Sequence, residues 1–301
     1  MKKLRPLWRV SILTSPEAEE AVAELLAGIV QQPVSVYLPA EKRDALVTVY
    51  LNERREFSHA KRRLVEEGLR TIARVGLSIG PGQIRVRRVR REDWAESWKR
   101  HFKPLEIGPT LLVKPSWSKR RPKRHQVVVI LDPGLSFGTG QHPTTRFCLR
   151  QLAAFRDGKR AQSFLDIGTG SGILAISAVK LGYAPVAGID FDPQAVLVAR
   201  SNAARNGVLA RARLVCRDLL RLPLRPARKY DMICANLIYD LLLAGKERIL
   251  SRLQPGGLLV LSGILRSQFP AVQRVYRGNK LRMLEKEAEN EWESGAFVLE
   301  K

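Results

Sequence analysis

An acidic residue followed by three glycines is the stretch of this chain best suited to hold a ligand. Residues 164–175 read FLDIGTGSGILA, with Asp166 ending an apolar run and Gly168, Gly170 and Gly172 following it. Glycine allows a backbone to turn sharply and to approach a bound molecule closely. The apolar residues that follow predict a helix whose first N–H groups and positive dipole end face the same space. Nucleotide cofactors are commonly bound by such a turn.

The glycine spacing and the acid favour S-adenosylmethionine over a dinucleotide. The spacing is G-x-G-x-G, whereas dinucleotide sites have G-x-G-x-x-G. Asp166 would repel a pyrophosphate but would suit a ligand that carries an ammonium and a sulfonium group. Asp190 ends a second apolar run, 18 residues after Gly172, where a carboxylate can accept hydrogen bonds from ribose hydroxyls. A plain structural turn is the alternative for the glycines alone.

Two other segments contribute candidate binding residues. The loop at residues 132–145 contains three glycines and two prolines, and it precedes the glycine turn. Thr139 in this loop offers a hydroxyl and a backbone N–H to a ligand. Asn236 ends the apolar run at residues 230–236, where strand ends of a parallel sheet open onto the ligand crevice. Its amide can both accept and donate hydrogen bonds.

The remaining candidates for chemistry are weaker. Asp218 follows a predicted strand and is a candidate contact for the adenine edge. His142 precedes Pro143 at a predicted helix start, where a histidine is more often structural, so we assign no general base and no catalytic residue. The three cysteines, Cys148, Cys216 and Cys234, are far apart and form no C-x-x-C. They therefore predict neither a disulfide framework nor a metal site; Cys216 and Cys234 are expected to be buried in apolar strands.

The elements around these motifs predict two domains and a linker. Strands alternate with helices over residues 126–301, which indicates a doubly wound α/β sheet. Residues 1–90 follow the order β-α-β-β-α-β of a ferredoxin-like unit and contain no glycine loop or histidine cluster, so we interpret them as a recognition domain. Residues 91–125 are expected to form a linker helix and a hairpin.

The linker contains aromatic and basic residues with open interpretations. Trp94, Trp98 and Phe102 recur four apart and fit one helix face, where packing between domains is favoured over stacking on RNA bases. The basic residues 119–124 are interpreted as the solvated tip of a hairpin whose strands lie near residues 111–113 and 126–131.

The net charge of +23 is distributed along the whole chain. Residues 1–125 carry 27 basic and 14 acidic residues, and residues 126–301 carry 25 and 15. This excess indicates either attraction to an anionic partner such as ribosomal RNA or compositional drift. No apolar run is long enough to cross a bilayer, and no signal-peptide pattern follows the basic start. A cytoplasmic monomer is expected.

Several of these motifs resemble the PrmA family, bacterial methyltransferases that modify large-subunit ribosomal protein eleven. They are FGTGQHPTT at 137–145, LDIGTGSG at 165–172, GIDFDP at 188–193 and ANL at 235–237. The segments DWA at 93–95, WK at 98–99 and PSW at 115–117 are similar as well. The loop and the tryptophan segment are more specific than the glycine and acid motifs, which occur in many methyltransferases. The resemblance covers almost the whole chain.

The resemblance implies a fold and an activity. The fold would be the seven-stranded, Rossmann-like sheet of a class I methyltransferase, preceded by a small α+β domain that holds the ribosomal protein. Thr139, Gly168, Asp190 and Asn236 would contact S-adenosylmethionine, beside Asp166 and Gly170. The products would be methylated lysine side chains and a methylated amino-terminal amine.

The strong basicity departs from the family pattern. It leaves open whether the substrate is the free ribosomal protein, an RNA-bound assembly or another protein. The alternatives are a protein-lysine methyltransferase with a different substrate and a non-catalytic RNA-binding protein on a methyltransferase fold. A nicotinamide dehydrogenase fits the glycine spacing least.

Overall fold

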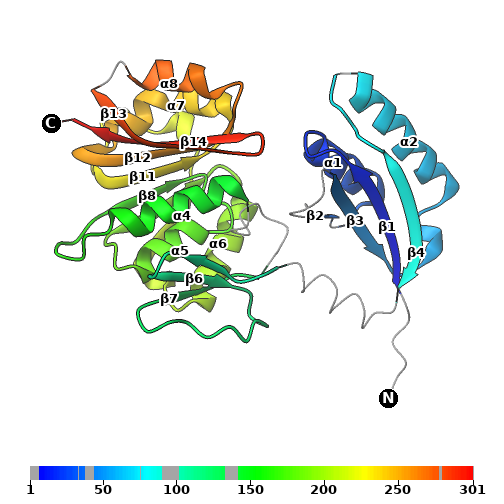
Figure 1. Ribbon diagram of the computed structural model, residues 1–301, viewed down its shortest axis with the longest axis horizontal. Helices are drawn as coiled ribbons and strands as arrows, with labels where there is room; N and C mark the ends of the chain where they lie inside the picture. The colour runs from blue at the N-terminus through cyan, green and yellow to red at the C-terminus, as the bar shows by residue number, and fades with distance from the viewer. Residues whose placement is uncertain are drawn as a thin grey trace. The chain divides into compact units, whose positions relative to one another are not determined.

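The chain folds into two compact units, residues 1–101 and residues 102–301 (Figure 1). The computed structural model describes residues 7–32, 34–37, 44–74, 76–89, 102–132, 142–277 and 280–300. Trp94, Trp98 and Thr139 lie outside the described residues. Residues 102–125, which the sequence analysis grouped with the linker, belong to the second unit.

The first unit is a four-stranded antiparallel sheet with two helices. Its elements are β1 (Leu7–Thr14), α1 (Glu19–Val30), β2 (Val34–Tyr37), β3 (Ala45–Leu51), the short 3-10 helix η1 (Arg54–Glu56), α2 (His59–Arg74) and β4 (Gln83–Val89). The strands lie in the order β2-β3-β1-β4, so the predicted β-α-β-β-α-β order is confirmed. Alternate residues of β1, Val10 and Ile12, are buried with the apolar residues of α1 and α2. The helices therefore cover one face of the sheet.

The second unit is built on a seven-stranded sheet. Its strands are β8 (Phe164–Ile167), β9 (Val186–Asp190), β10 (Ala212–Cys216), β11 (Tyr230–Asn236), β12 (Leu253–Leu265), β13 (Leu281–Glu289) and β14 (Trp292–Leu299). They lie in the order β10-β9-β8-β11-β12-β14-β13. Neighbours from β10 to β12 are parallel, and β14 is antiparallel to β12 and β13. The predicted doubly wound sheet of the class I methyltransferase type is confirmed.

Helices cover both faces of this sheet. One apolar core contains residues of α4 (Pro143–Phe155), α5 (Ile173–Lys180) and α6 (Pro193–Arg205). The other contains residues of α7 (Tyr239–Ser251) and α8 (Phe269–Arg277). Two 3-10 helices, η3 (Leu209–Arg211) and η4 (Leu219–Arg221), flank β10. Strand residues alternate between the two cores, as expected for a sheet that is buried on both sides.

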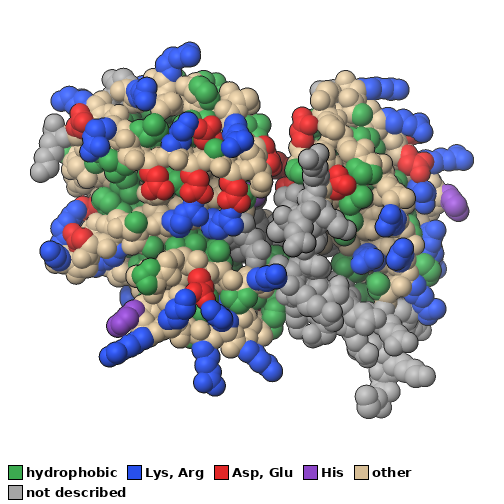
Figure 2. All heavy atoms as spheres, in the orientation of Figure 1, with side chains coloured by type: hydrophobic (Ala, Val, Ile, Leu, Met, Phe, Trp, Pro, Cys, Tyr) green, Lys and Arg blue, Asp and Glu red, His purple; other side chains and the backbone are tan. Residues whose placement is uncertain are grey.

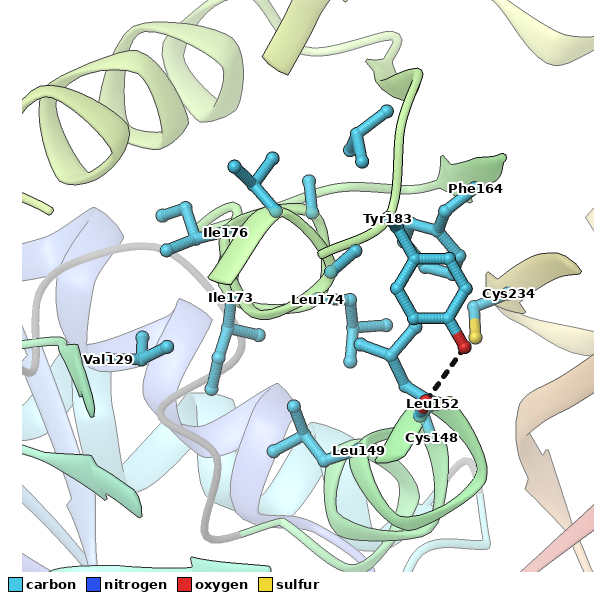
Figure 3. Close-up of a cluster of buried hydrophobic side chains, with 14 of the residues drawn as sticks. Val129, Cys148, Leu149, Leu152, Phe164, Ile173, Leu174, Ile176, Tyr183 and Cys234 are labelled. Carbon is cyan, nitrogen blue, oxygen red and sulfur yellow. Dashed lines mark hydrogen bonds between the residues drawn. The ribbon is translucent and has the colours of Figure 1, made fainter. Parts of the chain in front are cut away.

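Figure 3 shows the first of these cores, where α4 and α5 meet the sheet. The Tyr183 hydroxyl donates to the carbonyl oxygen of Leu152 at 2.8 Å, which ties the end of α4 to the segment after α5. Cys148 and Cys234 are buried here. The prediction for Cys216 is wrong: this residue ends the edge strand β10, so its side chain is exposed.

A three-stranded sheet precedes the large sheet in sequence. It consists of β5 (Leu105–Ile107), β6 (Leu111–Lys114) and β7 (Val127–Ile130). β5 and β6 form an antiparallel hairpin, whereas β6 and β7, which were expected to form one, are parallel. The basic residues 119–124 therefore connect two parallel strands, and their interpretation as a hairpin tip is wrong. Strand periodicity identifies a strand but not the direction of its partner.

The positive surface charge and the moderate hydropathy of the helices agree with the composition of the sequence. On the face shown in Figure 2, Lys and Arg side chains are spread over both units. In the part of the chain that the structure describes, no helix is long and apolar enough to span a membrane.

Candidate cofactor site

The glycine turn connects β8 to α5 in a backbone conformation that other residues rarely adopt. Gly168, Gly170 and Gly172 have φ angles of +77°, +50° and +81°. Such a conformation costs a residue with a Cβ about 1–2 kcal/mol. A Cβ on Gly172 would also lie 3.0 Å from the Cβ of Ala199 in α6. The turn thus directs α5 back across the sheet and allows it to pack closely on α6.

Asp166 organises this turn from inside the protein. Its side chain is fully buried, and Oδ2 accepts hydrogen bonds from the Thr169 hydroxyl at 2.8 Å and the Ala175 N–H at 3.2 Å. Among the described residues, Oδ1 has no hydrogen-bond partner. Burial raises the pKa of Asp166 to about 7, and the nearby Asp190 carboxylate adds to the effect. This carboxyl is therefore poised between its neutral and charged forms.

Asp190 lies at the end of β9 and joins that strand to the turn. Oδ2 accepts from the Gly170 N–H at 2.9 Å, and Oδ1 accepts from the Asp192 N–H at 3.1 Å. The next residue, Phe191, is 70% exposed although it is aromatic. A carboxylate and an exposed ring thus follow each other at the carboxyl edge of the sheet. The sequence analysis did not identify Phe191, because exposure cannot be inferred from one aromatic after a strand.

Asn236 lies at the same edge, on the strand beside the glycine turn. In the register of β8 and β11, Ala235 is opposite Ile167, so Asn236 lies beside the start of the turn. The Asn236 Nδ2 donates to the Thr144 hydroxyl at 3.3 Å. That hydroxyl lies 2.7 Å from the His142 Nδ1.

His142 is the N-cap of α4, and its Nδ1 accepts from the Thr144 N–H at 3.4 Å. Burial lowers the pKa of His142 to about 4. The ring is therefore neutral near pH 7, and its Nδ1 can accept the Thr144 hydroxyl proton. The Thr144 oxygen is then free to accept from Asn236. This chain of bonds fixes the Asn236 amide with its nitrogen toward α4.

Two serines hold the backbone at Thr144. The Ser262 hydroxyl donates to the Thr144 carbonyl oxygen at 3.2 Å and lies 2.6 Å from the Ser294 hydroxyl. Sequence reasoning missed Thr144 and both serines, since no local pattern indicates that they meet. Asp218, the candidate adenine contact, is the N-cap of η4, where its Oδ1 accepts from the Leu220 N–H at 2.8 Å.

The structure thus brings five of the six predicted site residues to one edge of the sheet. Asp166, Gly168, Gly170 and Asp190 are connected through the turn, and Asn236 lies on the adjacent strand. Among the described residues, neither Asp166 nor Asp190 is paired with a Lys or Arg, although the chain carries a net charge of +23. Two acids without a basic partner, at one edge of the sheet in so basic a protein, suit a cationic ligand. The described residues contain no group of three or more His, Cys, Asp or Glu that could hold a metal ion.

Comparisons with known proteins identify the family. The model of the family described as ribosomal protein L11 methyltransferase (PrmA) matches residues 6–299. A ribosomal protein L11 methyltransferase of Alkaliphilus oremlandii is 33% identical over 304 residues, which cover 94% of this chain and 95% of the relative. A second, of Geobacter metallireducens, is 42% identical over 212 residues, covering 70% and 68%.

A solved structure agrees. The ribosomal protein L11 methylase of Lactobacillus delbrueckii subsp. bulgaricus has a TM-score of 0.58 and 30% identity, over 66% of this chain and 100% of that chain. The fold, the strand-end acids and these matches lead to one assignment. The chain belongs to the ribosomal protein L11 methyltransferase (PrmA) family.

Proposed function

We propose that this protein transfers methyl groups from S-adenosylmethionine to lysine side chains and the amino-terminal amine of large-subunit ribosomal protein L11. Family membership over residues 6–299 supports the activity, the methyl donor and the substrate. The observation in the structure that carries the proposal is the pair of carboxylates, Asp166 and Asp190, which have no basic partner among the described residues. A different protein substrate and a non-catalytic RNA-binding role are not favoured.

The cofactor would be bound by the turn and the two strand ends. Asp190 has lone pairs left to accept from ribose hydroxyls, and the backbone at Gly168 and Gly170 lines the approach. Asp166 would act through the turn and through its charge, because its side chain is fully buried. Thr139 is proposed from sequence alone.

S-adenosylmethionine supplies an activated methyl group, so the protein's task is to place and deprotonate the amine. Alignment of the two reactants can contribute several kcal/mol. Because Thr144 engages the Asn236 nitrogen, the Asn236 oxygen remains to accept an N–H bond from the incoming amine. A free lysine has a pKa of about 10.4, and a dry crevice lowers it by penalising the charged form. We assign no general base.

The test is methyl transfer from labelled S-adenosylmethionine to purified L11. We expect incorporation with the native protein and a loss of cofactor affinity, measured by calorimetry, in Asp190→Ala. Asp157→Ala is the matched control, because that acid is exposed and accepts from the Lys159 N–H at 2.9 Å in the loop after α4. Unchanged affinity in Asp190→Ala would refute the role of this residue. Methylated L11 in a strain that lacks the gene would refute the substrate.

The proposal includes three further expectations about the protein's setting. It acts as a monomer, it works in the cytoplasm where its ribosomal substrate is assembled, and its basic surface contacts ribosomal RNA. The net charge of +23 supports the last of these. Size-exclusion chromatography with light scattering tests the oligomeric state.

A further inference from the structure

One face of the sheet in the first unit gathers arginines without acids. Val10 and Ile12 of β1 point to the helices, so the residues between them lie on the opposite face. The register places three rows on that face: Arg9 with Tyr50 and Arg87, Ser11 with Thr48 and Arg85, and Leu13 with Leu46 and Gln83. These rows contain no Asp or Glu. We call Arg9, Tyr50, Arg85 and Arg87 the arginine face.

The arginine face is hollowed. A cavity of about 100 Å³ lies over these rows. Ser11 and Thr48 are polar and lie on the side of the sheet that faces away from α1 and α2, yet they are buried, at 4% and 6% exposure. The larger side chains around them form its walls. The cavity is lined by Arg9, Ser11, Leu13, Leu46, Gln83, Arg85 and Arg87.

This arrangement is unfavourable in the protein alone. Arg9 lies directly opposite Arg87 on the neighbouring strand, and like charges in that position destabilise a sheet. The Arg9 Nε has no hydrogen-bond partner among the described residues. Arg85 donates from Nε and Nη2 to the neutral Gln83 side chain, at 3.0 and 2.7 Å, so its charge is not compensated. An anion on this face would remove the repulsion.

The helical side of the same unit differs. There, Arg62 of α2 pairs with Glu66 at 2.9 Å, and α1 begins with Glu19 and Glu20. The helical side thus carries charges of both signs, whereas the rows of the arginine face carry only positive ones.

We propose that the arginine face binds single-stranded RNA. Guanidinium groups bind phosphates with two parallel hydrogen bonds, and a Tyr ring provides a surface on which a base stacks. Tyr50 is half-buried and its hydroxyl is hydrogen-bonded to the Arg9 side chain, so the ring is held beside a phosphate-binding group. This combination of a flat ring with guanidinium groups favours RNA over an acidic peptide, which has no bases to stack.

This inference rests on the proposed function in one respect, because a ribosomal protein substrate would bring RNA to the enzyme. The binding itself is tested without methyl transfer. Full-length protein is titrated into a fluorescently labelled, mixed-sequence single-stranded RNA of about 12 nucleotides, and anisotropy is followed between about 50 and 200 mM salt.

The variants separate this face from general basicity. Arg85→Gln/Arg87→Gln is expected to bind at least about tenfold more weakly, and the slope of log affinity against log salt should flatten by about 1.4, since each lost phosphate contact accounts for about 0.7 on a single strand. Arg63→Gln/Arg70→Gln, with the same charge change on exposed positions of α2, should remain within about threefold of wild type. Tyr50→Leu should weaken binding with the salt slope unchanged.

Four results would overturn the proposal. Three of them are equal losses in the two double variants, no RNA binding by the native protein at low salt, and tighter binding of a polyglutamate peptide than of RNA at the same face. Methylation of free L11 is measured in parallel and should be unchanged in Arg85→Gln/Arg87→Gln. Its loss would make this face a protein-binding surface and would refute the RNA assignment, whereas a failure of the native protein to methylate L11 concerns the proposed function alone. A raised unfolding midpoint in the variant would confirm that it is folded and that charge repulsion has been relieved.

Discussion

Replacing Asp166 with Asn should make the protein more stable above neutral pH and weaken its cofactor binding. The folded carboxyl has a pKa of about 7, whereas the reference value is 3.8. Between these values the folded chain keeps a proton that the unfolded chain has released. The free energy of unfolding therefore falls as pH rises through this window, and it levels off above about pH 7.

The magnitude follows from the shift. At about 1.36 kcal/mol per pKa unit, the contribution lost between about pH 5 and about pH 8 is roughly 2.5 kcal/mol. The amide introduced by Asp166→Asn would keep an oxygen that accepts from the Thr169 hydroxyl and the Ala175 N–H, so the hydrogen bonds of the turn are preserved. The difference in stability between variant and wild type should change by this amount over that pH range, in favour of the variant.

Urea unfolding at several pH values measures this difference directly. Asp231→Asn is an informative control, because the Ser163 N–H and hydroxyl and the Arg160 side chain donate to Asp231 and hold its pKa below the usual value; that substitution should destabilise at pH 8. A difference between Asp166→Asn and wild type that is independent of pH would refute the reasoning. Calorimetry should show weaker S-adenosylmethionine binding by the variant at pH 8, where it lacks the buried negative charge.

Three other substitutions test the site. Gly172→Ala should lower the free energy of unfolding by more than the cost of a left-handed residue, about 1–2 kcal/mol, because the new Cβ would meet Ala199. The control is Gly158→Ala, at φ +73° in open space, which should show only that cost. Equal urea midpoints for the two variants would contradict the packing argument. From pH 7 to pH 5 the free energy of unfolding of the wild type should fall by up to about 2 kcal/mol, because the folded His142 ring, with a pKa of about 4, stays neutral while the unfolded ring, with a pKa near 6.5, takes up a proton. His142→Asn should remove this fall. Identical pH profiles of stability for variant and wild type would contradict the argument. Thr144→Val should lower kcat by up to about tenfold and leave the KM for the cofactor little changed, whereas Thr144→Ser should retain activity. A change in KM alone would argue against the role of Thr144 in positioning the Asn236 amide.

Local signals in the sequence predicted much of the fold. Asp192 before Pro193 is a typical signal for a helix start, and the Asp192 side chain does accept from the Gln194 N–H at 2.8 Å at the start of α6. Asn206-Gly207 is a typical signal for a helix end, and α6 ends at Arg205 with Asn206 as the C-cap. Capping and glycine turns are determined by a few neighbouring residues, so a single sequence contains the information.

Long-range partners were not predictable in this way. The Asn206 side chain accepts from the Ile130 N–H at 2.8 Å and donates to its carbonyl oxygen at 2.7 Å, 76 residues away. Gly263, with a φ angle of +81°, lies within β12 at a register irregularity between Leu261 and Ile264, and no local pattern distinguishes such a glycine from one in a turn. The hydrogen bond between Asn236 and Thr144 is of the same kind, because it depends on where α4 packs. The sequence therefore identified the residues of the site more readily than the groups that orient them.

The small sheet of β5, β6 and β7 has a consequence for synthesis of the chain. Its apolar residues Leu111, Val113 and Val129 are buried in a cluster with Ile173 and Ile176 of α5, which a ribosome translates more than 40 residues later. At a synthesis rate of about 5–20 residues per second, the apolar residues of these strands would remain exposed on the nascent chain for seconds before α5 is made. Chaperones and premature association would compete for the segment during that interval, and the arrival of α5 would end it.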